Sequence, residues 1–187
     1  MKFVPSIHST AAARHKGIRR QKGYNMIEIG LGLVIVTLLG VGVITYFSSN
    51  TAATQANLLG SDLTSLMGKV KSNYSGDYGS VSNAKLNTGG FFKSLPSLNN
   101  VAGVVSTNLG GGTLNVVPGT VTTANDSVQY TITQLPDAAC LPLVTSLVKS
   151  ATILKVGANT VKAAGGSADS SKITCSNDNT TMVLIVQ

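Results

Sequence analysis

An uninterrupted apolar run near the N-terminus dominates the hydropathy pattern of the chain. Residues 29–47 contain no charged side chain, and apart from Tyr46 only Thr37 and Thr45 carry polar groups. A helix of this length spans about 28 Å, close to the ~30 Å hydrocarbon core of a bilayer. The run is also longer than the apolar part of an ordinary secretory signal. It therefore predicts an uncleaved transmembrane helix.

Beyond this run, the apolar positions take up helical spacing. One face of an amphipathic helix is indicated by Ala52, Ala56, Leu59, Leu63, Leu66 and Val70, which recur every three or four residues. Together the two segments predict a single helix over residues 24–70, about 70 Å long. We expect its apolar first half, with residues 29–47, to protrude and its second half to pack on a globular head.

The rest of the chain, residues 71–187, predicts a head rich in strands. Residues 72–100 are rich in Ser, Asn and Gly, which is typical of a loop with little regular structure. Short runs of β-branched residues predict strands at 101–105, 113–117, 127–133, 152–156, 171–175 and 181–186. The last run is almost continuously apolar, which favours a central place in the sheet.

A short helix is predicted between these strands, within residues 135–151. Asp137 as N-cap, or Pro142 in the first turn, would open it. The expected fold class is therefore α+β, with one long N-terminal helix packed on an antiparallel β-sheet.

The charge is concentrated at the N-terminus. Of 14 Lys and Arg residues, six lie in the first 22 positions, where there is no acid: Lys2, Arg14, Lys16, Arg19, Arg20 and Lys22. Everything after Gly23 then carries eight cations against seven acids, a net charge of +1. A basic leader stays in the cytoplasm, so the head is expected to be translocated. No specific binding of nucleic acid is expected from so neutral a head.

The composition of the body leaves little for catalysis. Both histidines, His8 and His15, lie in the basic leader, and the only glutamate is Glu28. This excludes histidine-based triads and histidine-ligated metal sites from the head. We expect no catalytic residue, no cofactor and no metal, and hence no enzyme.

Glu28 is an unusual residue for a simple membrane anchor, because it lies at the edge of the apolar run. A carboxylate there is unfavourable in lipid unless it is paired, and it therefore indicates a function. The alternative is a glutamate that reaches back to the membrane surface.

The junction between the leader and the apolar run resembles the processing site of type IV prepilins. Gly23 ends the leader, Tyr24 follows, and Glu28 is the fifth residue counted from Tyr24. In that family a membrane aspartyl peptidase cuts after the glycine and N-methylates the new terminus, so the apolar helix is retained. The resemblance implies that residues 1–23 are removed, that Tyr24 is methylated and that Glu28 acts in assembly. In its length, the leader resembles those of the type IVb branch of the family.

The two cysteines strengthen this resemblance. Cys140 and Cys175 are separated by 35 residues, and an even count in a translocated head favours a disulfide, with two free thiols as the alternative. Type IV pilins carry a disulfide-bounded C-terminal region, and in type IVb members the first cysteine lies in a helix after a strand. The segment LPDAACLPLVTS resembles that layout, as in toxin-coregulated, bundle-forming and conjugative thin-pilus pilins. The resemblance implies a disulfide-bounded region over 140–175.

The resemblance implies a structural subunit of a type IVb pilus. Such a subunit would form a helical homo-oligomer through its apolar helix and would serve adhesion, aggregation or conjugative mating. Its partners would be the prepilin peptidase and the assembly machinery of the bacterial inner membrane. The precursor would reside in that membrane, and the assembled pilus would be extracellular. The alternatives are a minor pilin, a type II secretion pseudopilin, or a membrane-anchored adhesin that does not polymerise.

Overall fold

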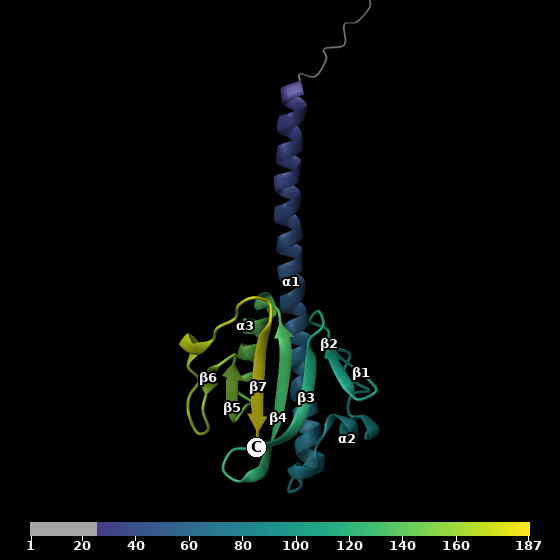
Figure 1. Ribbon diagram of the computed structural model, residues 1–187, viewed down its shortest axis with the longest axis vertical. Coiled ribbons are helices and arrows are strands. Elements are labelled where there is room, and N and C mark those ends of the chain that lie inside the picture. Colours follow the sequence, from purple (N-terminus) through teal and green to yellow (C-terminus); the bar gives the residue numbers. More distant parts are fainter. Residues whose placement is uncertain (1–25) are drawn as a thin grey trace, which may run out of the picture. The chain divides into compact units, whose positions relative to one another are not determined.

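A single helix opens the described part of the chain. The computed structural model describes residues 26–187, apart from the side chains of residues 26, 28 and 39–49. Helix α1 runs from Met26 to Tyr74, a length of 49 residues (Figure 1). The residues up to Val41 and those from Gly42 onward form two separate units. The helix expected over residues 24–70 is confirmed from Met26 on, and it continues one turn further.

Seven strands form one sheet in which every neighbouring pair is antiparallel, in the order β1-β2-β3-β4-β7-β5-β6. The strands are β1 Leu98–Val101, β2 Val104–Thr107, β3 Thr113–Thr120, β4 Ala124–Leu135, β5 Ile153–Val156, β6 Asn159–Lys162 and β7 Thr180–Val186. The apolar C-terminal strand β7 pairs with β4 on one side and β5 on the other, so its predicted central place is confirmed.

Besides α1 and the sheet, the described part of the α+β fold contains helix α2 at Asn83–Thr88, helix α3 at Asp137–Leu147, and 3-10 turns at η1 Tyr78–Ser80 and η2 Ser170–Lys172. Helix α3 is the one predicted within 135–151, but its N-cap is Pro136. Asp137 is thus the first helical residue, and Pro142 lies inside the helix, beyond its first turn. Both predicted ways of opening this helix were therefore wrong.

Three further predictions within the head were wrong in detail. Residues 101–105 are not one strand, because Ala102 and Gly103 take positive φ of 53° and 87° and turn β1 back into β2. Two such residues in succession match the tight turns that suit the twist of a hairpin. The strand expected at 171–175 is absent: η2 begins that segment, and the edge strand is β6 instead. The segment 72–100 contains η1, α2 and the start of β1, so it is more regular than expected.

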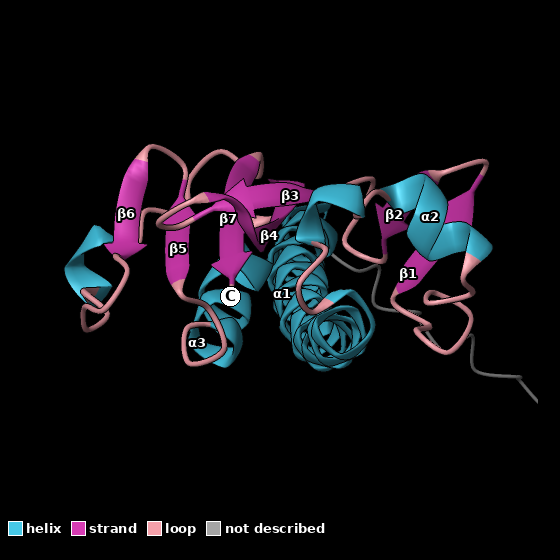
Figure 2. Cartoon of the chain, turned by 90° about the horizontal axis from the view of Figure 1, so that it is seen from below, coloured by secondary structure: helices cyan, strands magenta, loops and turns pink. Residues whose placement is uncertain are grey.

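The predicted apolar face of α1 forms one wall of the core. Its buried residues are Ala56, Leu59, Leu63, Leu66, Met67 and Val70, each at most 4% exposed. They belong to one cluster with sheet residues such as Leu114, Ile132 and Leu184. The part of α1 from Gly42 on and helix α3 lie on the same face of the sheet (Figure 2). Each fully buried leucine stabilises the head by about 1.5–3 kcal/mol relative to leaving it in water.

Side chains also join the segment after α1 to the sheet. The amide of Asn83 donates to the carbonyl oxygen of Leu114 and accepts from the backbone N–H of Val116. Strand β2 pairs with β3 only at residues 113 and 114. At Leu114 and Val116, the Asn83 side chain supplies hydrogen bonds to the backbone of β3 that a neighbouring strand would otherwise make. The carboxylate of Asp62 in α1 accepts from the N–H of Ser97 at 2.8 Å, just before β1. These bonds satisfy backbone groups that would otherwise lack partners.

Gly60 of α1 lies directly against side chains of α3. A Cβ added at Gly60 would collide with the hydroxyl of Ser146 and would lie 3.2 Å from its Cβ. That hydroxyl is already held by the carbonyl of Leu143 at 2.8 Å. The glycine therefore fits the packing of the two helices, although glycine is unfavourable inside a helix by about 1 kcal/mol.

We expect Gly60→Leu to lower the free energy of unfolding by about 1–3 kcal/mol, because the larger side chain forces α1 and α3 apart. The matched control is Gly68→Leu in the same helix, where an added Cβ meets no atom within 4 Å. That change should raise stability slightly through helix propensity. Denaturant unfolding followed by tyrosine near-UV circular dichroism measures both. Equal effects at the two positions would contradict the close packing.

Candidate assembly helix and disulfide-bounded region

The first part of α1 exposes apolar side chains on all sides. The exposed residues are Ile27, Ile29, Leu31, Leu33, Val34, Ile35, Val36 and Leu38, each between 49% and 77% exposed. The four consecutive residues Leu33 to Val36 alone complete one turn of 3.6 residues. A helix that is apolar all round is stable only when an apolar environment surrounds it. This segment is therefore an interaction surface.

The one polar side chain described in this segment is already satisfied by the helix itself. The hydroxyl of Thr37 donates to the carbonyl oxygen of Val34 at 2.8 Å. A hydroxyl bonded in this way adds no unpaired donor when the helix enters an apolar environment. Residues 29–38 therefore present a surface that needs no water.

Within the described residues, no helix combines the length and the hydropathy needed to cross a membrane. The transmembrane helix predicted at 29–47 includes residues 39–47, whose side chains lie outside the described set.

The predicted processing residues, Gly23 and Tyr24, lie outside the described residues. Glu28 is the third residue of α1, but its side chain also lies outside them. The assignments of these three residues therefore remain predictions.

Cys140 and Cys175 form a disulfide, with 6.0 Å between their Cα atoms. Cys140 is fully buried in α3, and Cys175 lies half-buried in the segment between η2 and β7. The bond attaches that segment to α3 and closes a loop that contains β5 and β6. The region 140–175 is thus bounded by a covalent link, as the resemblance implied.

A second link lies beside the disulfide. The N–H of Asp137 donates to the carboxylate of Asp178 at 2.8 Å, and the N–H of Asp178 donates to the carboxylate of Asp137 at 3.1 Å. Asp178 adopts φ 47°, and Asn177 before it φ 65°, so the chain turns sharply here. The reciprocal bonds attach this turn to the start of α3.

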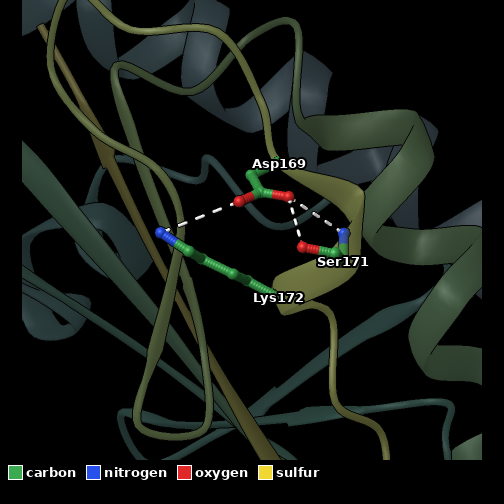
Figure 3. Close-up of polar contacts among 3 residues, drawn as sticks. All are labelled: Asp169, Ser171 and Lys172. Atoms are coloured by element: carbon green, nitrogen blue, oxygen red, sulfur yellow. Dashed lines mark hydrogen bonds and ion pairs between the residues drawn. The ribbon is translucent and has the colours of Figure 1, made fainter.

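Within the disulfide-bounded region, Asp169 organises the connection from β6 to β7. Its carboxylate accepts from the hydroxyl of Ser171 at 2.6 Å and from the Ser171 N–H at 3.1 Å (Figure 3). Lys172 forms an exposed ion pair with it at 3.7 Å. The bond from the Ser171 hydroxyl is the main cause that lowers the pKa of Asp169. The Asp169 N–H also donates to the carbonyl of Val161, which satisfies part of the outer edge of β6.

Lys162 of β6 closes the C-terminal end of α3. Its ammonium group donates to the carbonyl oxygens of Val148 at 3.0 Å and Ala151 at 2.7 Å. A cation at that end of a helix is favourable, because the last carbonyls lack partners within the helix. Helix α3 is thus held at its start by Asp178, in its first turn by the disulfide and at its end by Lys162.

Asp126 stabilises the turn that joins β3 to β4. Its carboxylate accepts from the N–H of Thr123 at 2.9 Å and from the hydroxyl of Thr122 at 2.7 Å, and these bonds lower its pKa. Because this pKa is lower in the folded chain than in the unfolded one, the ionised carboxylate stabilises the fold at pH values above the ordinary carboxyl pKa. This stabilisation is lost as the pH falls through the pKa of the folded state.

In the core of the head, burial raises the pKa of Tyr130 above its ordinary value.

The side chains of the described residues pack in the core and form internal hydrogen bonds. Among them, no three His, Cys, Asp or Glu side chains lie close enough to hold a metal ion. Sequence reasoning missed Gly60, Lys162 and Asp178. Gly60 had a signal, because it lies four residues after Ala56 and three before Leu63 on the predicted apolar face. The other two had none, since their partners are distant in the sequence.

Comparison with known proteins identifies the family of the chain. The family described as PilS N terminal matches residues 48–187, three quarters of the chain. No curated protein sequence matches this chain. The crystal structure of type IV b pilin from Salmonella typhi is similar, with 20% sequence identity, a TM-score of 0.46, and coverage of 72% of this chain and 97% of that chain. The chain belongs to the PilS family of type IV pilins, so the type IV pilin predicted from its sequence is confirmed.

Proposed function

We propose that the chain polymerises into a type IVb pilus through the apolar first part of α1. The observation that carries this proposal is the run of exposed side chains from Ile27 to Leu38, which covers all sides of the helix. A surface apolar all round suits a position between several identical helices in a filament core, where each helix is surrounded by others. Electron microscopy should show filaments on producing cells and none on cells that lack the gene for this chain.

Before assembly, the apolar segment 29–47 would anchor the precursor in the bacterial inner membrane with the basic leader in the cytoplasm. The prepilin peptidase would remove residues 1–23, and the inner-membrane assembly machinery would move the subunit into the growing pilus. The extracellular pilus would then serve adhesion, aggregation or conjugative mating.

Glu28 would align the subunits. Once the leader is removed, the α-amino group of Tyr24 is a cation at the start of the apolar helix, and the next cation along the chain after Glu28 is Lys69. The Glu28 carboxylate of one subunit would pair with the Tyr24 amino group of its neighbour. Because the attraction between two charges in an apolar medium falls steeply with distance, this pair would set the axial position of each incoming subunit.

Processing gives a prediction of its own. The mature protein should begin at Tyr24 and contain 164 of the 187 residues, since 23 are removed. Mass spectrometry of the N-terminal peptide should find one added methyl group on the Tyr24 α-amine. Gly23→Val should block processing, because a branched side chain crowds the peptidase site. A mature terminus after Ala53 would instead indicate an ordinary secreted domain.

A further inference from the structure

An open cavity of about 600 Å³ lies at one end of the sheet, next to the disulfide. One wall is the turn between β5 and β6, Val156 to Asn159, and the other is formed by residues of the segment 174–181, without Cys175 and Asp178. The end of β5 and the start of β7 are adjacent because Val156 pairs with Met182 (Figure 1). Its volume lies within the range of small-molecule sites, about 300–1,000 Å³.

The two walls are joined by bonds that do not depend on a ligand. The N–H of Gly157 donates to the carbonyl of Thr181 at 2.8 Å, and the amide of Asn159 donates to the hydroxyl of Thr174 at 3.0 Å. Cys175, the residue after Thr174, is fixed to α3 by the disulfide. The cavity is therefore formed in advance, so that a ligand would not have to order it.

The lining combines polar and apolar surface and includes no charged side chain. Its polar side chains are Asn159, Thr174, Ser176, Asn177, Asn179, Thr180 and Thr181. Within the described part of the chain, the side chains of Asn177, Asn179 and Thr181 make no hydrogen bond. The carboxamides and hydroxyls together offer donors and acceptors in similar number, with no lysine, arginine or carboxylate among them.

This chemistry selects the class of ligand. Binding of an ion would be unfavourable, because the ion would lose its hydration in a site that holds no opposite charge. Binding of an apolar molecule would also be unfavourable, because it would cover the amide groups and leave them without hydrogen-bond partners. A neutral molecule rich in hydroxyl groups avoids both penalties, because each hydroxyl donates and accepts. A volume of 600 Å³ equals that of roughly 20 water molecules at about 30 Å³ each, enough for one or two sugar rings.

We propose that this cavity is a binding site for neutral hexose units of glycans. The inference rests on the proposed function only in that it names a ligand class for adhesion; binding by the cavity itself requires no filament. In a filament, many copies of the cavity would be displayed together, so weak binding by each copy would suffice for firm attachment.

Ligand-observed saturation-transfer NMR tests the site on the full chain. The chain is kept in a zwitterionic detergent, because alkyl glycoside detergents carry the proposed ligand themselves. The probes are the methyl glycosides of glucose, galactose, mannose and N-acetylglucosamine at millimolar concentration, and glucuronate serves as the charged counterpart of glucose. We expect at least one glycoside to bind, and glucuronate to bind more weakly than methyl glucoside. Competition by a disaccharide then distinguishes a free hexose from the end of a longer glycan, which should bind more tightly.

Matched variants locate the binding. Asn179→Ala combined with Thr181→Val removes two hydrogen-bonding groups from the cavity and should weaken binding about tenfold or more. Asn115→Ala combined with Thr120→Val makes the same two changes at exposed positions of β3, outside the cavity, and should leave binding unchanged. The Glu28→Ala chain should also bind as the wild type does, which separates this site from filament assembly. Absence of binding by all four glycosides, preference for glucuronate, or equal binding by the two double variants would overturn the proposal.

Discussion

Cells whose only copy of this protein carries Glu28→Ala should process it normally and still display few or no pili. Removing the carboxylate makes the start of α1 more apolar, so membrane insertion and cleavage before Tyr24 should continue. The α-amino group of Tyr24 on the neighbouring subunit, however, would enter the filament core without a partner. Leaving one member of a buried ion pair alone is unfavourable by about 3–5 kcal/mol, which is more than a hundredfold in the docking equilibrium.

Two further substitutions separate charge from shape at this position. Glu28→Gln keeps the size and the hydrogen-bonding capacity of the side chain and should fail as Glu28→Ala does. Glu28→Asp keeps the charge on a shorter side chain and should retain part of the assembly. Counts of pili by electron microscopy, together with mass spectrometry of the cell-associated pilin, measure assembly and processing separately. Pili in wild-type numbers on the Glu28→Ala cells would exclude the proposed pairing.

Loss of the disulfide should lower the free energy of unfolding by about 4 kcal/mol. The bond joins residues 35 apart, and in the chain-entropy account a loop of this length restricts the unfolded chain by that amount. Typical domains are stable by only about 5–15 kcal/mol, so the loss is a large fraction of the total. Cys175→Ser suits this test better than Cys140→Ser, because Cys140 is fully buried and a serine there would add a buried hydroxyl.

Reduction of the wild-type chain provides the control for this substitution. Cys175→Ser and reduced wild type should unfold at the same, lower denaturant concentration, while Cys175→Ser itself should not respond to reductant. Hydrogen exchange should report the earliest opening in residues 163–178. Beyond the disulfide, that segment is attached to the rest of the head through Asp169, the bond from Asn159 to Thr174 and the Asp137–Asp178 pair. Identical unfolding of oxidised and reduced wild type would show that the bond contributes nothing to stability.

Features carried by neighbouring residues were predictable from the sequence. The apolar face of α1 follows from spacings of three and four residues, and every residue of it from Ala56 to Val70 is buried. Strand β7 was predictable because six consecutive apolar or β-branched residues favour a central strand, and β7 lies between β4 and β5. The alternation of Val128, Tyr130 and Ile132 correctly marked the inner face of β4. In these cases the spacing of apolar residues along the chain directly indicates the period of the helix or strand.

The errors arose where a turn or a distant partner decides the local structure. Val101, Val104 and Val105 favour a strand, but the turn at Ala102 and Gly103 divides them between two strands. Residues 171–175 include β-branched residues, yet the Asp169 carboxylate holds Ser171 in a 3-10 turn and the disulfide attaches Cys175 to α3. Asn159–Lys162 becomes a strand because Gly157, at φ 58°, returns the chain alongside β5.

The sequence by itself predicted the class of this protein from a basic N-terminal stretch, an apolar helix continuing into an amphipathic one, and a strand-rich segment with two cysteines. Each of these is a property of one segment, because hydropathy, charge and helical period need no partner. Only the tertiary structure decided that Gly60 of α1 adjoins Ser146, that Lys162 closes α3, and that the β5–β6 turn and Thr174–Thr181 enclose a neutral cavity. These features depend on contacts between residues distant in the chain, whose pairing is set by the packing of the whole head rather than by any local pattern.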